Sequence, residues 1–224
     1  MCGDNREDIF NLVSLNLISN KIKVKIIGGG RASYIKAKGL LEKGCLVHIL
    51  SKDFSEDILE LEKENIILEE GEYYKEFIKK CHLVIIAVDD EVICEKICND
   101  CEEEYKVYIN ASNFREGVGI IPYSKSYKNL SFSIGSKIGS PKVTREIGRE
   151  IEKIVEENDE YSIIVGNIRR KAKKEKRKEE IIEFVSGELF KKAFFCGEGY
   201  ALLNKTFGEE ISKRLLDLKS DLKI

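Results

Sequence analysis

Short apolar runs and amphipathic segments alternate along the first half of the chain. Residues 23–27 form a strand-like run that ends in Gly28-Gly29-Gly30, and residues 32–41 carry apolar side chains at helical spacing. Gly44 ends that helix, and residues 45–50 are the near-continuous apolar run typical of a buried parallel strand. The pattern therefore predicts a complete strand, helix and strand unit by residue 50.

The same alternation continues to about residue 112. The pattern predicts further strands over residues 66–69, 83–88 and 106–110, and helices over residues 73–80 and 91–101. Strands that alternate with helices favour a parallel sheet with helices on its faces. We therefore expect a Rossmann-type α/β domain with about five strands.

The second half of the chain has a different pattern. Residues 130–135 alternate like a strand with one wetter face, and Ser140-Pro141 supplies a natural N-cap and first residue for an amphipathic helix over 142 to about 157. From residue 161 onward the pattern is helical, with glycine breaks. We expect three parts: a dinucleotide-binding domain over 1–121, a small α+β segment over 122–158, and a helical C-terminal region over 159–224.

Composition narrows the class of protein. The 38 Lys and Arg residues nearly balance the 40 Asp and Glu residues, so no overall field favours nucleic acid or a membrane surface as a partner. No stretch approaches the roughly 20 apolar residues of a membrane span, and residues 1–4 lack the features of a signal peptide. Seven cysteines, an odd count in a chain of this length, favour free thiols. These features predict a cytoplasmic protein.

The glycine turn is the strongest chemical signal. Gly28-x-Gly30-x-x-Ser33 lies between a predicted strand and a predicted helix, where backbone N–H groups and the helix dipole favour a pyrophosphate. This context favours dinucleotide binding over a glycine-rich turn that binds nothing. The predicted cofactor-binding residues are Gly28, Gly30, Arg31, Ala32, Ser51, Lys52, Asp53 and Asp89.

Two acidic positions after predicted strands each have two interpretations. Asp53 lies about 20 residues after the glycines, where an acidic residue commonly binds the ribose hydroxyls of NAD; Lys52 beside it is suited to the 2′-phosphate of NADP, and a solvated turn is the alternative. We expect NAD as the cofactor. Asp89 and Asp90 either border the nicotinamide pocket or, for Asp90, cap the next helix.

Other clusters favour structural roles. Cys94-x-x-x-Cys98-x-x-Cys101 has the spacing of an iron–sulfur motif, but it is also one face of a helix, and the packed face is the favoured interpretation. The basic run over 169–178 is interpreted as a solvated helix face, with steering of an anionic ligand as the alternative. His48 and His82 are expected to be structural, so no metal site is predicted.

Four segments together resemble the precorrin-2 dehydrogenases, the family that includes the N-terminal part of siroheme synthase. The segments are Ile27-Gly28-Gly29-Gly30-x-x-Ser33-x-x-Lys36-Ala37, Ala87-Val88-Asp89-Asp90, Asn110-Ala111-Ser112-Asn113 and Ser140-Pro141-x-x-x-Arg145. They follow the family's order and nearly its spacing. The resemblance covers about residues 15–155 and extends only loosely into the helical tail.

The resemblance implies NAD-dependent oxidation of precorrin-2 to sirohydrochlorin in siroheme and cobalamin biosynthesis. It also implies a homodimer in which the middle segment forms the interface, and in some members ferrochelatase activity. Basic residues would suit the carboxylates of the tetrapyrrole substrate. The expected substrate-binding residues are Asn110, Ser136, Lys137, Ser140 and Arg145, with Lys142 nearby.

The chain departs from the family at one catalytic position. The family places an aspartate, the expected general base, where this chain has Asn113 or, on a shifted alignment, Ser112, and Lys137-Ile138 replaces a Gly-Gly pair. An amide or hydroxyl does not accept a proton as a carboxylate does. Because the nicotinamide performs the hydride transfer, a dehydrogenase remains the first hypothesis. The alternatives are a non-catalytic NAD- or tetrapyrrole-binding or delivery protein, and an NAD-dependent enzyme or sensor for another small molecule.

Overall fold

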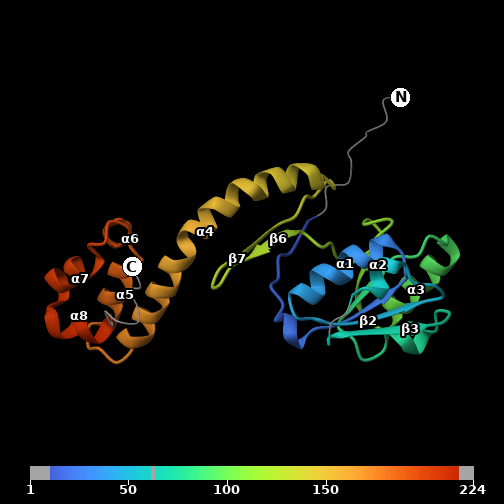
Figure 1. The fold of residues 1–224 in the computed structure, drawn as a ribbon, viewed down its shortest axis with the longest axis horizontal. Helices are drawn as coiled ribbons and strands as arrows, with labels where there is room; N and C mark the ends of the chain where they lie inside the picture. Colours follow the sequence, from blue (N-terminus) through green and yellow to red (C-terminus); the bar gives the residue numbers. More distant parts are fainter. Residues whose placement is uncertain (1–10, 62–63, 217–224) are drawn as a thin grey trace. The chain divides into compact units, whose positions relative to one another are not determined.

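The computed structural model describes residues 11–61 and 64–216, which form two compact units (Figure 1). The first unit comprises the chain up to Pro122 together with Gly135–Gly139, and the second comprises Tyr123–Ile134 and the chain from Ser140 onward. Residues 1–4, on which the absence of a signal peptide was argued, lie outside the described residues.

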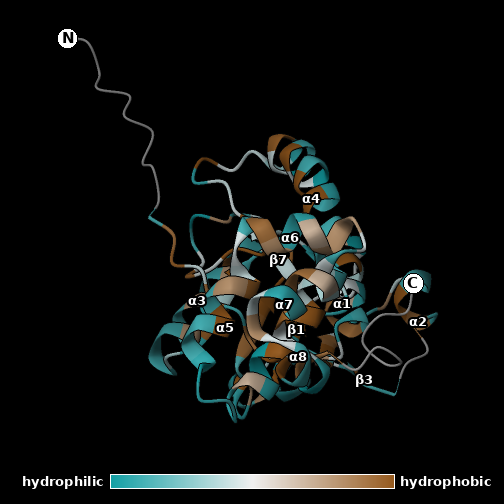
Figure 2. Cartoon of the chain, turned by 90° about the vertical axis from the view of Figure 1, so that its left-hand side faces the viewer, coloured by the Kyte–Doolittle hydropathy of each residue, from teal (hydrophilic) through white to brown (hydrophobic). Residues whose placement is uncertain are grey.

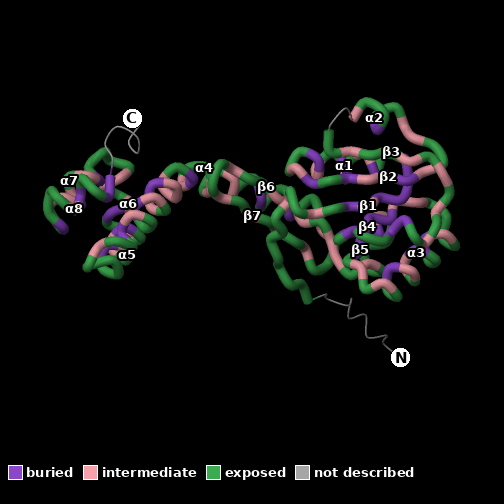
Figure 3. Tube along the Cα trace, turned by 90° about the horizontal axis from the view of Figure 1, so that it is seen from below, coloured by how far each residue is buried: buried purple, intermediate pink, exposed green. Residues whose placement is uncertain are grey.

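A parallel five-stranded sheet forms the centre of the first unit. Figure 3 shows its strands side by side in the order β3-β2-β1-β4-β5. In this order the sequence in which strands are added reverses between β1 and β4, which is the topological switch point of the sheet. The order confirms the predicted Rossmann-type fold. The strands are β1 (Lys23–Ile27), β2 (Leu46–Ser51), β3 (Ile66–Glu70), β4 (Leu83–Ile86) and β5 (Val107–Asn110).

Helices cover both faces of this sheet. On one face, Val24 and Ile26 of β1 pack in a cluster with residues of α1 (Arg31–Glu42) and α2 (Glu56–Leu59). On the other face, Ile27 packs with residues of α3 (Glu91–Glu103) and of the 3-10 helix η2 (Lys75–Ile78). Both faces of β4 are buried, which explains why its sequence is apolar at every position rather than alternating.

The predicted helix over residues 73–80 is wrong in length and type. Only Lys75–Ile78 are helical, as a single 3-10 turn that buries Phe77 and Ile78. Lys79 then has an extended backbone and Lys80 has a positive φ of 58°, so the chain turns toward β4 instead of continuing the helix. A second 3-10 turn, η1 (Ser19–Lys21), precedes β1.

The second unit combines a hairpin with a group of helices. The antiparallel hairpin of β6 (Tyr123–Ser126) and β7 (Ser131–Ile134) packs against α4 (Pro141–Ala172). The predicted helix ended near residue 157, but α4 continues because Ile164, Ile168 and Ala172 extend its apolar face into a core of their own. The remaining helices are α5 (Lys178–Ser186), α6 (Glu188–Phe195), α7 (Gly199–Phe207) and α8 (Glu209–Leu215).

Asp159 joins the hairpin to α4. Its carboxylate is buried, and Oδ1 accepts hydrogen bonds from the backbone N–H groups of Asn129 and Leu130, at 3.0 and 2.7 Å. We expect Asp159→Ala to destabilise the second unit by about 1–3 kcal/mol, because two partly buried N–H donors lose their acceptor. Urea unfolding followed by circular dichroism measures this, and an unchanged midpoint would contradict it.

No helix within the described residues is both long enough and apolar enough to cross a bilayer.

Candidate functional site

The glycine turn joins β1 to α1 at the carboxyl edge of the sheet. Gly28 has a φ of +117°, and a Cβ at this position would lie 2.1 Å from the carbonyl oxygen of Ala87. A Cβ on Gly29 would lie 1.9 Å from the carbonyl oxygen of Asp53. Both residues must therefore be glycine for the turn to pack against the segments that follow β2 and β4.

A cleft of about 570 Å³ opens in front of this turn. Six of the eight predicted cofactor-binding residues line it, namely Gly28, Gly30, Ser51, Lys52, Asp53 and Asp89. Arg31 and Ala32 are not among its lining residues; they form the exposed first turn of α1. Sequence reasoning missed Glu72 and Tyr73, which also line the cleft because they follow β3 at the same edge of the sheet.

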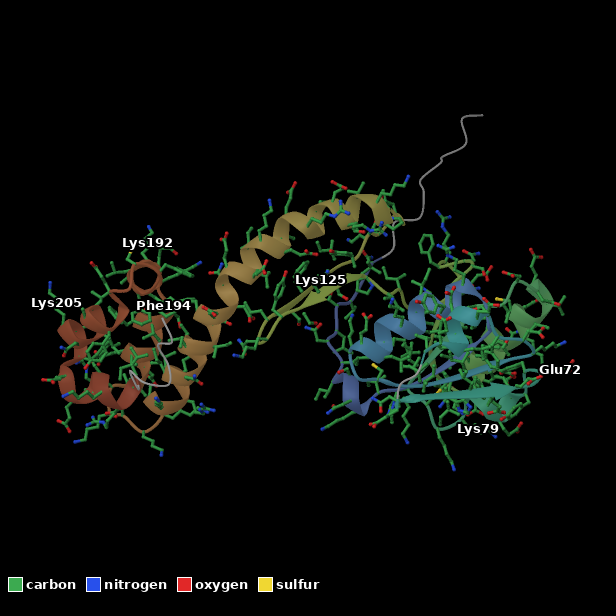
Figure 4. The ribbon with its side chains drawn as sticks, in the orientation of Figure 1. Glu72, Lys79, Lys125, Lys192, Phe194 and Lys205 are labelled. Carbon is green, nitrogen blue, oxygen red and sulfur yellow. The ribbon has the colours of Figure 1, made fainter. Side chains whose placement is uncertain are left out.

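Lys52 is already paired at the rim of this cleft. Its Nζ lies 3.0 Å from Oε1 of Glu72, the residue labelled at the edge of the first unit in Figure 4. The hydrogen bond that Lys52 donates to Glu72 raises the pKa of Lys52, and it lowers the pKa of Glu72. Both side chains are largely exposed, so this pair contributes little to stability.

The cleft suits a dinucleotide. Gly30 is the N-cap of α1, and no side chain caps the helix there. A Cβ on Gly30 would meet nothing within 4 Å, so the space beside it is open to a ligand. The first N–H groups of a helix lack partners within the helix and attract an anion such as a pyrophosphate. Ser33, the third residue of the motif, is fully buried, where only a small side chain fits.

A second cleft, of about 720 Å³, adjoins the first. Val88 and Asp89 line both clefts, because they follow β4 at the switch in strand order. The second cleft is also lined by Asn110, Ser112 and Asn113, the segment at which the family's aspartate was expected. The structure therefore brings the Asp89 segment and the Asn110 segment together beside the cofactor cleft.

A carboxylate that sequence reasoning missed belongs to this cleft. Oε1 of Glu116 accepts a hydrogen bond from Nδ2 of Asn113, and Oε2 accepts one from Nδ2 of Asn110, both at 2.8 Å. Oδ1 of Asn110 accepts the backbone N–H groups of Ser112 and Asn113, both at 3.0 Å. The spacing of three residues between Asn110, Asn113 and Glu116 is the only sequence signal for this network, and it is weak.

The cysteines of α3 pack against the core, and two of them also line the cleft. Cys101 is fully buried in the core, Cys94 is buried in the same core cluster, and Cys94 and Cys98 also line the second cleft. Nδ2 of Asn110 donates to the Sγ of Cys94 at 3.2 Å. Burial raises the pKa of both thiols, to about 12 for Cys98. The predicted packed face is thus confirmed, because Cys94 and Cys101 belong to the core cluster and Cys98 packs against it. The structure does not group Cys101 with the other two thiols as an iron–sulfur motif requires.

Other predicted residues lie elsewhere. Ser136 lines a small hollow of about 100 Å³ in the first unit, and Lys137 beside it is exposed. Ser140 is the N-cap residue of α4, and Arg145 is exposed on the first turns of that helix in the second unit.

Two structural interpretations are confirmed, and a third is correct only in part. Oδ1 of Asp90 accepts the backbone N–H groups of Val92 and Ile93, so Asp90 is the N-cap of α3. Nε2 of His48 lies 2.9 Å from Oε2 of Glu69, and Nδ1 of His82 accepts the backbone N–H of Lys23 at 3.0 Å. The basic run over 169–178 is mostly exposed, as predicted, but the predicted single helix face is wrong, because the run spans the end of α4, a turn and the start of α5.

Comparisons with known proteins agree with this geometry. Residues 15–123 match a family model described as "Putative NAD(P)-binding". A "Putative precorrin-2 dehydrogenase" of Methanocaldococcus jannaschii is 30% identical over 147 residues, which cover 61% of this chain and 70% of that protein. The solved structure of SirC, a precorrin-2 dehydrogenase, matches with a TM-score of 0.68 at 21% identity, covering 90% of this chain and all of SirC.

Siroheme synthases match over a smaller share of their length. Those of Salmonella paratyphi A and Salmonella typhimurium are 24% identical over 153 residues, which cover 67% of this chain. This chain spans a third of the length of these relatives.

Proposed function

The chain belongs to the precorrin-2 dehydrogenase family, and we propose that it oxidises precorrin-2 to sirohydrochlorin with NAD⁺ as the hydride acceptor. One observation carries the proposal. A dinucleotide cleft and a second cleft of about 720 Å³ share Val88 and Asp89 at the carboxyl edge of the sheet. Ligands of open parallel sheets bind at this switch point, so a substrate in the second cleft adjoins the cofactor.

The residues of the first cleft are suited to binding and orienting the cofactor. When bound, NAD⁺ accepts a hydride from the carbon that is oxidised. Gly29 and Gly30 would hold the pyrophosphate through backbone N–H groups, and Asp53 would bind the ribose hydroxyls, whereas the N–H of Gly28 donates to the carbonyl oxygen of Leu50. These interactions orient the cofactor toward the second cleft.

Oxidation also releases one proton for each hydride transferred, and this proton needs an acceptor. Asn113 is an amide and does not serve, but it holds the carboxylate of Glu116 in the same cleft. We propose that Glu116 accepts the proton in place of the aspartate that the family has near Asn113. The donors from Asn110 and Asn113 position the carboxylate for this role.

Recognition of the substrate's carboxylates needs basic groups, and none of the residues that line the second cleft is Lys or Arg. We propose that Lys137, which is exposed in the first unit, binds these carboxylates. A homodimer is supported by Val143, Ile147 and Ile154, which are exposed apolar residues along α4. In Figure 2, apolar and polar colours lie side by side along this helix.

The preference for NAD⁺ over NADP⁺ is a separate expectation. We expect Asp53→Ser to shift the ratio of dissociation constants toward NADP⁺ by about tenfold, or 1.4 kcal/mol, because it removes the acceptor for the ribose hydroxyls and a charge that repels a 2′-phosphate. Competition of NAD⁺ and of NADP⁺ with bound, fluorescent NADH measures the two dissociation constants and hence their ratio. The matched control is Asp57→Ser, which removes a charge from α2 outside the cleft. An unchanged ratio in Asp53→Ser would show that Asp53 does not contact the ribose.

The reaction itself is tested with freshly prepared precorrin-2 and NAD⁺ under anaerobic conditions. We expect NADH absorbance to rise together with the spectrum of sirohydrochlorin. Intact NAD⁺ binding without NADH formation would contradict the dehydrogenase and would favour a binding or delivery protein.

A further inference from the structure

Three potential metal ligands meet in the second cleft. Cys94 and Cys98 come from α3, and Glu116 comes from the loop after β5. The two Sγ atoms and a carboxylate oxygen of Glu116 all lie within 4.8 Å of one another. Cys94 is buried, Cys98 is half-buried and Glu116 is exposed, so the group lies on the wall of the cleft and opens into it.

The local structure holds these ligands in place. Residues four apart on a helix lie on one face, so α3 presents both thiols to the same side. Asn110 donates from Nδ2 to both the Sγ of Cys94 and the carboxylate of Glu116, and Asn113 donates to the other carboxylate oxygen. Outer hydrogen bonds of this kind orient the ligands of metal sites.

The charge of the cleft favours a cation. Asp89, Glu91 and Glu95 line the same cleft as Glu116, and no Lys or Arg is among the lining residues. A concave surface that carries charge of one sign concentrates ions of the opposite sign. The carboxylates of this cleft therefore suit a metal ion.

We propose that Cys94, Cys98 and Glu116 bind a thiophilic divalent cation of the Zn²⁺ or Co²⁺ type, although the sequence predicted no metal site. Two thiolates and one carboxylate are ligands that Zn²⁺ accepts, and three protein ligands leave the fourth position open to the cleft. Tetrahedral bonds of about 2.0–2.3 Å place ligand atoms about 3.3–3.8 Å apart, so binding needs only a small closure of the group. Each thiol releases its proton to solvent when it coordinates the ion.

The metal site does not rest on the proposed dehydrogenase reaction. It shares Glu116 with that reaction, however, and one carboxylate does not accept a proton while it coordinates a metal ion. The cation and proton transfer at Glu116 are therefore mutually exclusive.

The test is a titration of the full-length, reduced protein with Co²⁺, in the absence of NAD⁺ and substrate. We expect one equivalent to produce a thiolate-to-cobalt charge-transfer band and tetrahedral visible bands, and Zn²⁺ to displace it. Cys94→Ser, Cys98→Ser and Glu116→Gln should each weaken binding by more than the ~10–100-fold that is typical of losing a supporting residue. NAD⁺ binding by Cys98→Ser, which does not line the cofactor cleft, checks that the variant is folded.

The matched control is Cys196→Ser, which removes an exposed thiol from the second unit and should leave the Co²⁺ bands unchanged. A wild-type protein without charge-transfer absorption would overturn the proposal. A band that survives both Cys94→Ser and Cys98→Ser would also overturn it, because another thiol would then be the ligand. Since neither measurement uses turnover, a failure of the dehydrogenase assay leaves this result unaffected.

Discussion

Gly28→Ala is expected to weaken NAD⁺ binding at least ~100-fold, or about 2.7 kcal/mol, and to destabilise the first unit. The φ of +117° strains any residue with a Cβ, and that Cβ would lie 2.1 Å from the carbonyl oxygen of Ala87. The turn and the segment after β4 must then separate, which displaces the N–H groups that bind the pyrophosphate. Quenching of NADH fluorescence measures binding, and thermal unfolding measures stability.

Substitutions of two other glycines distinguish the effect of backbone strain from the effect of filling the space that the cofactor needs. A Cβ on Gly39 of α1 meets nothing within 4 Å, so Gly39→Ala should retain NAD⁺ binding and stabilise the helix by up to ~1 kcal/mol. A Cβ on Gly30 also meets nothing, but it enters the cleft. Gly30→Ala should therefore weaken binding without loss of stability. Full binding by Gly30→Ala would show that the pyrophosphate does not approach this residue.

The sheet was predictable because its signals are local. Each strand of the sheet is a short run bounded by turn residues, and burial on both faces makes β4 apolar at every position. Strand β6 was not predicted, because Tyr123–Ser126 is polar and becomes a strand only through its pairing with β7. The length of α4 was likewise underestimated, since its last turns depend on packing against helices far along the chain.

The cofactor cleft was predictable and the second cleft was not. The glycine turn is one continuous motif, whereas Glu116 reaches the cleft only because its loop folds back on β5. The backbone N–H of Val118 donates to the carbonyl oxygen of Tyr108, and the Tyr108 hydroxyl donates to the carbonyl oxygen of Glu116. A Cβ on Gly117 would lie 2.9 Å from the backbone nitrogen of Asn110, so this close return needs glycine. Such a contact has no periodic pattern in the sequence.

The consequence is that the missing aspartate need not mean a missing carboxylate. Asn113 and Asn110 together hold Glu116, so the amide at the family's acidic position has a partner that an aspartate there would repel. Asn113→Asp would place a second carboxylate against Glu116. The asparagine and the glutamate are therefore best understood as one unit.

Glu116→Gln is accordingly expected to lower kcat for precorrin-2 oxidation by about 10²–10⁴-fold while the affinity for NAD⁺ stays unchanged. Glutamine retains an oxygen and the approximate shape of the side chain, but it does not accept the proton that leaves the substrate. Steady-state NADH formation at saturating NAD⁺ separates kcat from KM, and NADH fluorescence reports cofactor affinity. The loss should appear mainly in kcat, because Glu116 does not line the cofactor cleft.

Glu95→Gln is the matched control for charge. Glu95 lines the same cleft from α3 but does not take part in the group formed by Cys94, Cys98 and Glu116. Its loss removes one negative charge from the cleft and leaves the hydrogen bonds of Asn110 and Asn113 intact. If Glu95→Gln and Glu116→Gln lower kcat equally, the field of the cleft rather than a proton acceptor controls the rate. If Glu116→Gln turns over like the wild type, solvent accepts the proton and the nicotinamide geometry alone sustains the oxidation.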